Sequence, residues 1–234
     1  STKKKPDLAT KELSMSDWLK NMRDPDGAAP MRRRFQEMLA DGRHAFDSAM
    51  TVILTGSDPA DVREDVFKTD RRINQNEMAL RRELVVHATV HGPNAFPMAL
   101  VLMSIGKDAE RIGDYAKNLL DLAVHSSGLS DEERENIRLR AAETSELLLR
   151  AASVFDSQDE DAARKFLLDE QDVRRACETQ ISTWLEDSSR NRAAACLCLR
   201  FMKRVAGHSG NVVSSVCMPL DKLDFHPGGG GDED

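Results

Sequence analysis

Residues 102–118, LMSIGKDAERIGDYAKN, combine an apolar helical pattern with a dense run of charged side chains. Apolar residues recur every three or four positions, which predicts an amphipathic helix rather than a strand. At 100° per residue, Glu110, Asp114 and Asn118 form a polar stripe along this helix, and Arg111 lies beside it. Two acids, an arginine and an amide on one side of a helix suit either a binding site or an ion-pair network.

A second polar stripe lies upstream. Asp70, Asn74, Glu77 and Arg81 are spaced four, three and four residues apart, which places them within about 60° of one another on a helix. Two facing helices with such stripes would gather several carboxylates and two amides, and oxygen-rich clusters suit Mg²⁺, Mn²⁺, Ca²⁺ or iron. The same residues would equally suit a solvated face or a salt-bridge network closed by Arg81 and Arg111.

The same helical periodicity continues along most of the chain. It predicts six long helices, over about residues 31–54, 58–91, 96–126, 130–155, 157–186 and 191–217. Asp58 is expected to cap the second helix, with Pro59 in its first turn. The motifs SDEE at 130–133 and SQDE at 157–160 are expected to be capping boxes of the fourth and fifth helices.

The chain also repeats itself. The opening stretch aligns with LCLRFMKRVAGHSGN when Arg111 is placed on Arg204 and Asn118 on Asn211. We therefore predict an all-α protein built from two tandem three-helix bundles. The predicted divisions are a tail at 1–29, a first repeat at 30–128, a second repeat at 129–218 and a flexible tail at 219–234. Trp18 and Leu19 could anchor a short helix in the first tail.

Composition narrows the class of protein. The 234 residues are 40% apolar and only 5% aromatic, with a net charge of −7 and charges of both signs interspersed. This balance does not indicate a nucleic-acid-binding protein. Because no run of about 18 apolar residues occurs and no apolar stretch follows the first lysines, we expect neither membrane insertion nor a secretory signal. The four cysteines form no zinc-like pair and are expected to be reduced, in the cytoplasm.

DAERIGDYAKN at 108–118, together with DRRIN at 70–74 and the following Glu77, resembles the signature of the PhoU family, the regulators of bacterial phosphate uptake. The resemblance extends over about residues 31–217. It implies an all-helical, cytoplasmic, often dimeric and non-enzymatic protein. Such proteins exert negative control on phosphate signalling through a sensor histidine kinase and the ATPase of the phosphate ABC transporter. Some bind iron or other metal clusters through their acidic motifs, and others are metal-free.

The resemblance implies two groups of site residues. The expected metal ligands are Asp70, Asn74, Glu77, Glu110, Asp114 and Asn118, and the expected structural ion-pair residues are Asp108, Arg111, Arg81, Arg204 and Asn211. In the second repeat the positions of Asp108, Glu110 and Asp114 are taken by Phe201, Lys203 and Gly207. We therefore expect at most one good metal site, in the first bundle, for iron, zinc, manganese or magnesium.

Four other interpretations remain open. A helical dimerisation scaffold without metal would need the acidic stripes only as an ion-pair network. A di-metal carboxylate enzyme would need Glu-x-x-His motifs, which this sequence lacks. His87 and His91, four residues apart, could bind zinc but have no evident third ligand. The chain could also be the cytosolic part of a sodium–phosphate cotransporter.

Overall fold

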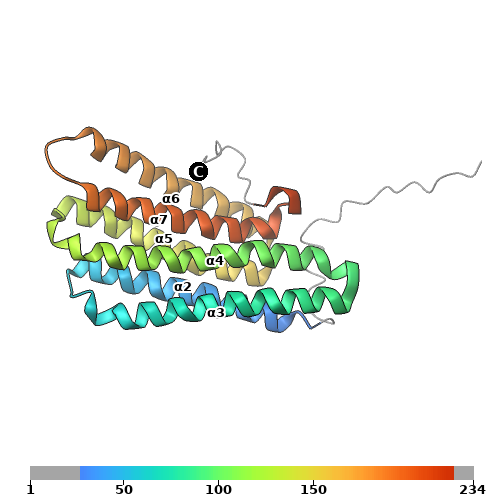
Figure 1. The fold of residues 1–234 in the computed structure, drawn as a ribbon. Helices are drawn as coiled ribbons and strands as arrows, with labels where there is room; N and C mark the ends of the chain where they lie inside the picture. The colour runs from blue at the N-terminus through green and yellow to red at the C-terminus, as the bar shows by residue number, and fades with distance from the viewer. Residues whose placement is uncertain (1–26, 224–234) are drawn as a thin grey trace, which may run out of the picture.

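The computed structural model describes residues 27–223, which form six long α-helices and three short 3-10 segments and contain no strand. The long helices are α2 (Ala29–Thr55), α3 (Ala60–His91), α4 (Phe96–Leu122), α5 (Asp131–Ser157), α6 (Glu160–Glu186) and α7 (Ala193–Cys217). The short ones are η1 (Gly92–Ala95), η2 (Ala123–Gly128) and η3 (Leu220–Lys222). The long helices run up and down along a common axis (Figure 1). The all-α prediction is confirmed; the helix expected at Trp18 and Leu19 lies outside the described residues.

Several of the helix ends follow from local chemistry. Gly56 takes the left-handed conformation at φ 69° and ends α2. Asp58 accepts a 2.9 Å hydrogen bond from the Ala60 backbone N–H, which is the capping role expected of it. The capping box at the start of α5 is confirmed, because Ser130 Oγ accepts from the Glu133 N–H while the Glu133 carboxylate accepts from the Ser130 N–H.

The second predicted capping box is wrong. Ser157 is the last residue of α5, and Gln158 follows it in the left-handed conformation at φ 55°. The cap of α6 is instead Asp159, whose carboxylate accepts from the N–H groups of Asp161 and Ala162 at 2.9 and 3.0 Å. The carboxylate of Asp159 thus satisfies two free donors of the next helix, so that helix begins three residues later than predicted.

The two three-helix units lie side by side. Helices α2, α3 and α4 pack together, as do α5, α6 and α7, and the units meet where α4 contacts α7 and α2 contacts α5. Figure 1 shows α3 and α6 at opposite edges of the molecule. The largest hydrophobic cluster runs through both units, and the rings of Phe35 in α2 and Phe155 in α5 lie 4.7 Å apart within it. The two predicted bundles therefore share one core.

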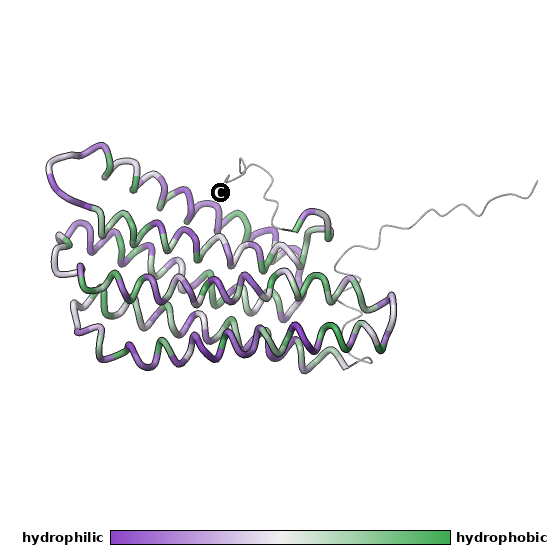
Figure 2. The backbone as a smooth tube through the Cα atoms, in the orientation of Figure 1, coloured by the Kyte–Doolittle hydropathy of each residue, from purple (hydrophilic) through white to green (hydrophobic). Residues whose placement is uncertain are grey.

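Helix α4 is the central element. Apolar and polar residues alternate around the helices (Figure 2), and α4 buries apolar residues against α2, α3 and α7. Gly113 allows α3 to approach closely, because a Cβ atom there would lie 2.9 Å from Ile73 Cδ1 and 3.6 Å from Asp70 Oδ1. This close approach brings the polar stripe of α3 against that of α4.

Candidate functional site

The two predicted stripes meet along the seam between α3 and α4. We call Asp70 and Glu77 of α3, with Glu110 and Asp114 of α4, the α3–α4 acidic cluster. The ammonium of Lys117 joins the two helices, because its Nζ lies 3.0 Å from Asp70 Oδ1 and 3.0 Å from Asp114 Oδ1. The cluster is therefore already neutralised in part by a lysine of the chain itself.

The remaining acids of the α3–α4 acidic cluster also have cationic neighbours. Arg81 Nη2 lies 2.6 Å from Glu77 Oε1 within α3. Arg111 lies 3.3 Å from an Asp114 oxygen and 3.8 Å from a Glu110 oxygen. Both guanidinium groups are about half exposed, so water screens these ion pairs and each contributes little to stability.

The two predicted amide ligands lie in different surroundings. Asn74 Nδ2 donates to Asp70 Oδ2 at 3.2 Å, so this amide lies within the seam. Asn118 is exposed, one turn beyond Asp114. Five of the six predicted ligands therefore gather along the seam, and Asn118 stands at its open end.

Glu110 is the acid most affected by this environment. Its pKa is raised to about 7, first by burial and then by the charge of Asp114 and a hydrogen bond with Asp114; the charge of Arg111 opposes this rise, and the charge of Glu77 adds the smallest part of it. A carboxyl group with a pKa near 7 exchanges a proton near neutral pH. Protonation of Glu110 alone can therefore change the charge of the seam by one unit.

Lys117 is the residue that sequence reasoning missed. It lies three residues after Asp114 and so shares a helix face with it, and this spacing was the available signal. Its pairing with Asp70 depends on the packing of α3 against α4. Its pKa is raised by the hydrogen bonds and charges of both carboxylates, which outweigh the cost of burial, so it stays charged.

The chemistry of the seam suits a hard cation only in part. Carboxylate and amide oxygens are suitable ligands, but the Lys117 ammonium lies between Asp70 and Asp114. Over residues 27–223, no group of three or more His, Cys, Asp or Glu side chains is arranged to hold a metal ion. A cation between those two carboxylates would therefore have to displace Lys117.

A second polar contact joins α4 to α7. The buried carboxylate of Asp108 accepts hydrogen bonds from His208 Nδ1 and Asn211 Nδ2, both at 2.8 Å. Arg204 Nε donates to the Tyr115 hydroxyl at 3.2 Å. Residues from the opening stretch and from its repeat therefore bind one another across the boundary between the two units.

The geometry of this contact follows the internal repeat. The alignment that places Arg111 on Arg204 also places Asp108 on Phe201 and Tyr115 on His208. Exchanging the two copies therefore turns the Asp108–His208 contact into a contact between Phe201 and Tyr115, and these two rings do lie 5.9 Å apart. Helices α4 and α7 thus pack antiparallel about an approximate two-fold axis.

The second unit lacks an equivalent acidic cluster. The alignment places Gly210 opposite Lys117, and Glu170 of α6 packs directly over this glycine. Glu170 is fully buried, and neither carboxylate oxygen has a hydrogen-bond donor among residues 27–223. Arg174 Nε lies 3.6 Å away, too far for a hydrogen bond, so it acts only through its charge. Burial raises the pKa of Glu170 to about 7.

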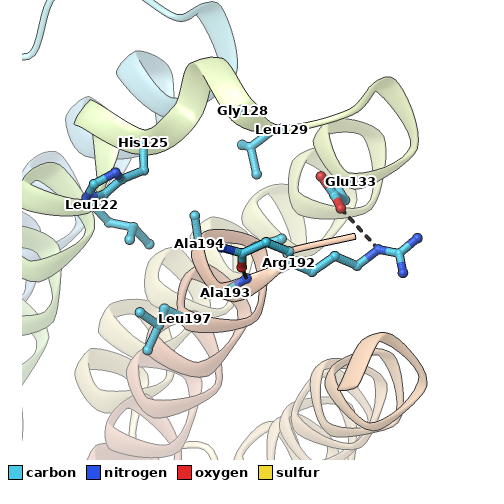
Figure 3. Close-up of a pocket in the computed structure, with 11 residues that line it drawn as sticks. Leu122, His125, Gly128, Leu129, Glu133, Arg192, Ala193, Ala194 and Leu197 are labelled. Carbon is cyan, nitrogen blue, oxygen red and sulfur yellow. Dashed lines mark hydrogen bonds and ion pairs between the residues drawn. The ribbon is translucent and has the colours of Figure 1, made fainter. Parts of the chain in front are cut away.

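A pocket of about 430 Å³ lies where η2, the start of α5 and the start of α7 meet (Figure 3). Its polar wall is Glu133, which is 1% exposed and is held by Arg190 at 3.2 Å and Arg192 at 3.1 Å. These ion pairs connect the N-terminal cap of α5 to the residues at the start of α7. Because the charges are already paired within the chain, they have a structural role. Sequence reasoning assigned no role to this network.

Comparisons with known proteins agree with the fold. Residues 35–123, which include the whole α3–α4 acidic cluster, match the PhoU domain family. PhoU from Pseudomonas aeruginosa superimposes with a TM-score of 0.71 at 21% identity, over 80% of this chain and 94% of that one. The phosphate transport system regulatory protein PhoU from Streptococcus pneumoniae gives 0.66 at 16% identity, over 84% and 96%.

Two further findings complete the comparison. No curated protein matches the sequence. Among the helices of residues 27–223, none is long and apolar enough to cross a membrane. The predicted resemblance is nevertheless confirmed: residues 35–123 match the PhoU domain family, and the described helices have the fold of the PhoU proteins.

Proposed function

We propose that this protein is a non-enzymatic regulator of phosphate uptake and phosphate signalling that acts by binding other proteins. The observation that carries the proposal is the PhoU domain at residues 35–123, which contains both polar stripes. The structural likeness to a phosphate transport system regulatory protein supports it. The acidic cluster then serves as a charged surface whose state a partner can sense.

The partners that we propose are a sensor histidine kinase and the ATPase of a phosphate ABC transporter, contacted in the cytoplasm by a homodimer. A binding protein changes the activity of such partners only if it binds one of their conformational states more tightly than the other. Helix α3 lies at an edge of the molecule (Figure 1). Of the four acids of the cluster, Glu110 and Asp114 are the more exposed, with side chains 19% and 28% exposed, and so are the ones that a partner would contact.

A complementation experiment tests this role. We expect the chain, expressed in a bacterium that lacks its own PhoU, to restore repression of a phosphate-starvation reporter in high phosphate. Asp114→Ala should reduce this repression. Asp121→Ala is the matched control, because Asp121 lies on the same helix but forms an exposed ion pair with Arg63. A folded protein that neither represses the reporter nor binds the purified kinase or ATPase would exclude the regulatory role.

We also propose one metal site in the α3–α4 acidic cluster, for iron, zinc, manganese or magnesium. Asp70, Glu77, Glu110 and Asp114 would supply carboxylates and Asn74 an amide oxygen. The support is the chemistry of these donors and their shared seam. Bound metal would supply fixed positive charge that orders the seam, in place of the Lys117 ammonium.

Metal content measured by plasma mass spectrometry on untagged protein tests the site. We expect near-stoichiometric metal in the parent, its loss in Asp114→Ala, and equal or higher occupancy in Lys117→Gln, which removes the competing ammonium. Metal missing from all three proteins after incubation with each cation would rule the site out.

The alternative function is a metal-free helical dimerisation scaffold. The observation in its favour is that Lys117, Arg81 and Arg111 already neutralise the acids of the cluster. The two functions predict different effects of the Asp114→Ala substitution. If Asp114→Ala leaves metal content, melting temperature and reporter repression unchanged, the scaffold is correct.

A further inference from the structure

An open groove of about 450 Å³ lies between the start of α2 and the last turns of α3. Its lining is mixed but largely apolar: Pro30 and Met31 line it from α2 and Val86 and Val90 from α3, and α3 also contributes Arg82, Glu83, His87 and His91. Val86 is 62% exposed and Val90 is 71% exposed. Val86 and Val90 together form an exposed apolar patch at the groove. Such patches usually mark a site that binds another segment or partner.

The first described residue of the chain lies at this groove. Gly27 is also part of its lining, so residues 1–26 leave the described structure directly beside Val86 and Val90. Gly27 has φ 78°, a left-handed conformation that glycine favours at turns. In sequence, DPDG at 24–27 has the composition of a turn.

The sequence before this turn has the chemistry of a groove-binding helix. Leu8, Met15, Trp18, Leu19 and Met22 fall within about 100° of one another at helical spacing. Within residues 14–22 the other side carries serine, aspartate, lysine and asparagine, whereas Leu13, just before them, falls on this polar side. Ser14, with Asp17 three residues later, matches the signature of a helix start. Residues 14–22 thus predict a short amphipathic helix.

We propose that residues 14–22 of this chain dock into the groove between α2 and α3, with the apolar side around Trp18 covering Val86 and Val90. This inference goes beyond the proposed regulatory function and does not depend on it. The nine residues from Trp18 to Gly27 span at most about 30 Å, whereas Val86 and Val90 are one helical turn, about 6 Å, apart. A tethered segment also acts at an effective concentration of about millimolar, which favours it over a separate partner.

Trp18 provides a direct probe in the full-length protein. The chain has two tryptophans, and Trp184→Phe leaves Trp18 as the only one. Trp184 is 3% exposed and its indole N–H has no hydrogen-bond partner, so phenylalanine is a mild replacement. In this parent we expect blue-shifted Trp18 emission and weak quenching by acrylamide at high dilution.

Charges in the groove should release the segment. We expect the double variant Val86→Asp, Val90→Asp to shift Trp18 emission to the red and to raise the acrylamide quenching constant several-fold. Leu168→Asp is the matched control, because Leu168 is an equally exposed apolar residue, at 64%, on the distant helix α6. Helical circular dichroism should differ among the three proteins by no more than the signal of the nine residues 14–22, since Val86, Val90 and Leu168 do not belong to the buried core.

Hydrogen exchange provides a second, independent readout. Trp18→Ala should speed amide exchange in the last turns of α3 and leave α6 unchanged. Three results would each overturn the proposal: quenching of Trp18 in the parent as strong as in urea-unfolded chain, quenching insensitive to the groove charges, or protection that appears only as protein concentration rises. The last result would assign the groove to a second copy of the chain.

Discussion

The carboxylate of Asp108 in α4 lies 2.8 Å from Nδ1 of His208 in α7, although the two residues are one hundred positions apart. The same oxygen accepts from Asn211, so a single buried acid holds two donors of the other repeat. This contact joins the three-helix units through the opening stretch of one and its counterpart in the other.

Removal of this acceptor should weaken the boundary between the units. Asp108→Ala leaves the donors of His208 and Asn211 without their partner, and we expect the free energy of unfolding in urea to fall by about 1–3 kcal/mol. The control is His44→Ala, which removes another His–Asp pair, with Asp65, whose side chains are more than half exposed. That loss should stay below about 1 kcal/mol. Equal losses in both variants would mean that the Asp108 contact has no special role.

Glu170 should make stability depend on pH. Its folded pKa of about 7 lies above the ordinary value of 4.5, so the folded state holds its proton more tightly than the unfolded state. The contribution of Glu170 to stability is therefore fully present below pH about 4.5 and is lost as pH rises to about 7, by an amount on the order of 2–3 kcal/mol.

Glu170→Gln should remove this component of the pH dependence and make the protein more stable than the parent at pH 8. Urea unfolding at several pH values measures it. Glu64→Gln, at an exposed position of α3, should follow the parent curve. A Glu170→Gln protein that loses the same stability between pH 5 and pH 8 as the parent would show that Glu170 is ionised without cost.

Glu110 should titrate near neutral pH. Its pKa of about 7 is due first to burial and then to Asp114. Asp114→Asn removes a neighbouring negative charge, so the Glu110 pKa should fall. Carboxyl carbon shifts in ¹³C NMR measure this directly. The exposed Asp121→Asn serves as the control, and an unchanged Glu110 pKa in Asp114→Asn would show that the two acids do not interact.

Arg134 should be a strong structural contributor. Its guanidinium donates to the carbonyls of Ile53 at 2.8 Å, Leu54 at 2.9 Å and Ser126 at 3.1 Å. It thereby ties the end of α2 and η2 to α5. Arg134→Ala leaves these carbonyls without a donor, and we expect a loss of about 2–3 kcal/mol in urea unfolding.

The control for Arg134 lies one turn further along α5. Arg138 pairs only with Glu135 among residues 27–223, and both side chains are more than half exposed. Arg138→Ala should cost less than about 1 kcal/mol. If the two arginines proved equivalent, the carbonyl contacts of Arg134 would be replaced by water without loss.

Much of the architecture could be predicted from local pattern. Helical periodicity located all six long helices, and the SDEE capping box and Gly56 set two of their ends. The internal alignment of Arg111 with Arg204 also predicted the repeat of the three-helix unit, whereas the antiparallel contact of α4 and α7 is seen only in the structure. These features depend on residues a few positions apart, or on the likeness of two segments, and both are visible in the chain before it folds.

Tertiary packing set the partner of each charge. The stripes placed Asp70 and Asp114 on facing helices, but only the approach of α3 to α4 at Gly113 puts Lys117 between them. Likewise, nothing local distinguishes Glu170 from an exposed acid; burial over Gly210 removes its water and raises its pKa. Periodicity gives the direction of a side chain around its own helix, whereas its partners and its hydration depend on which helix packs over it.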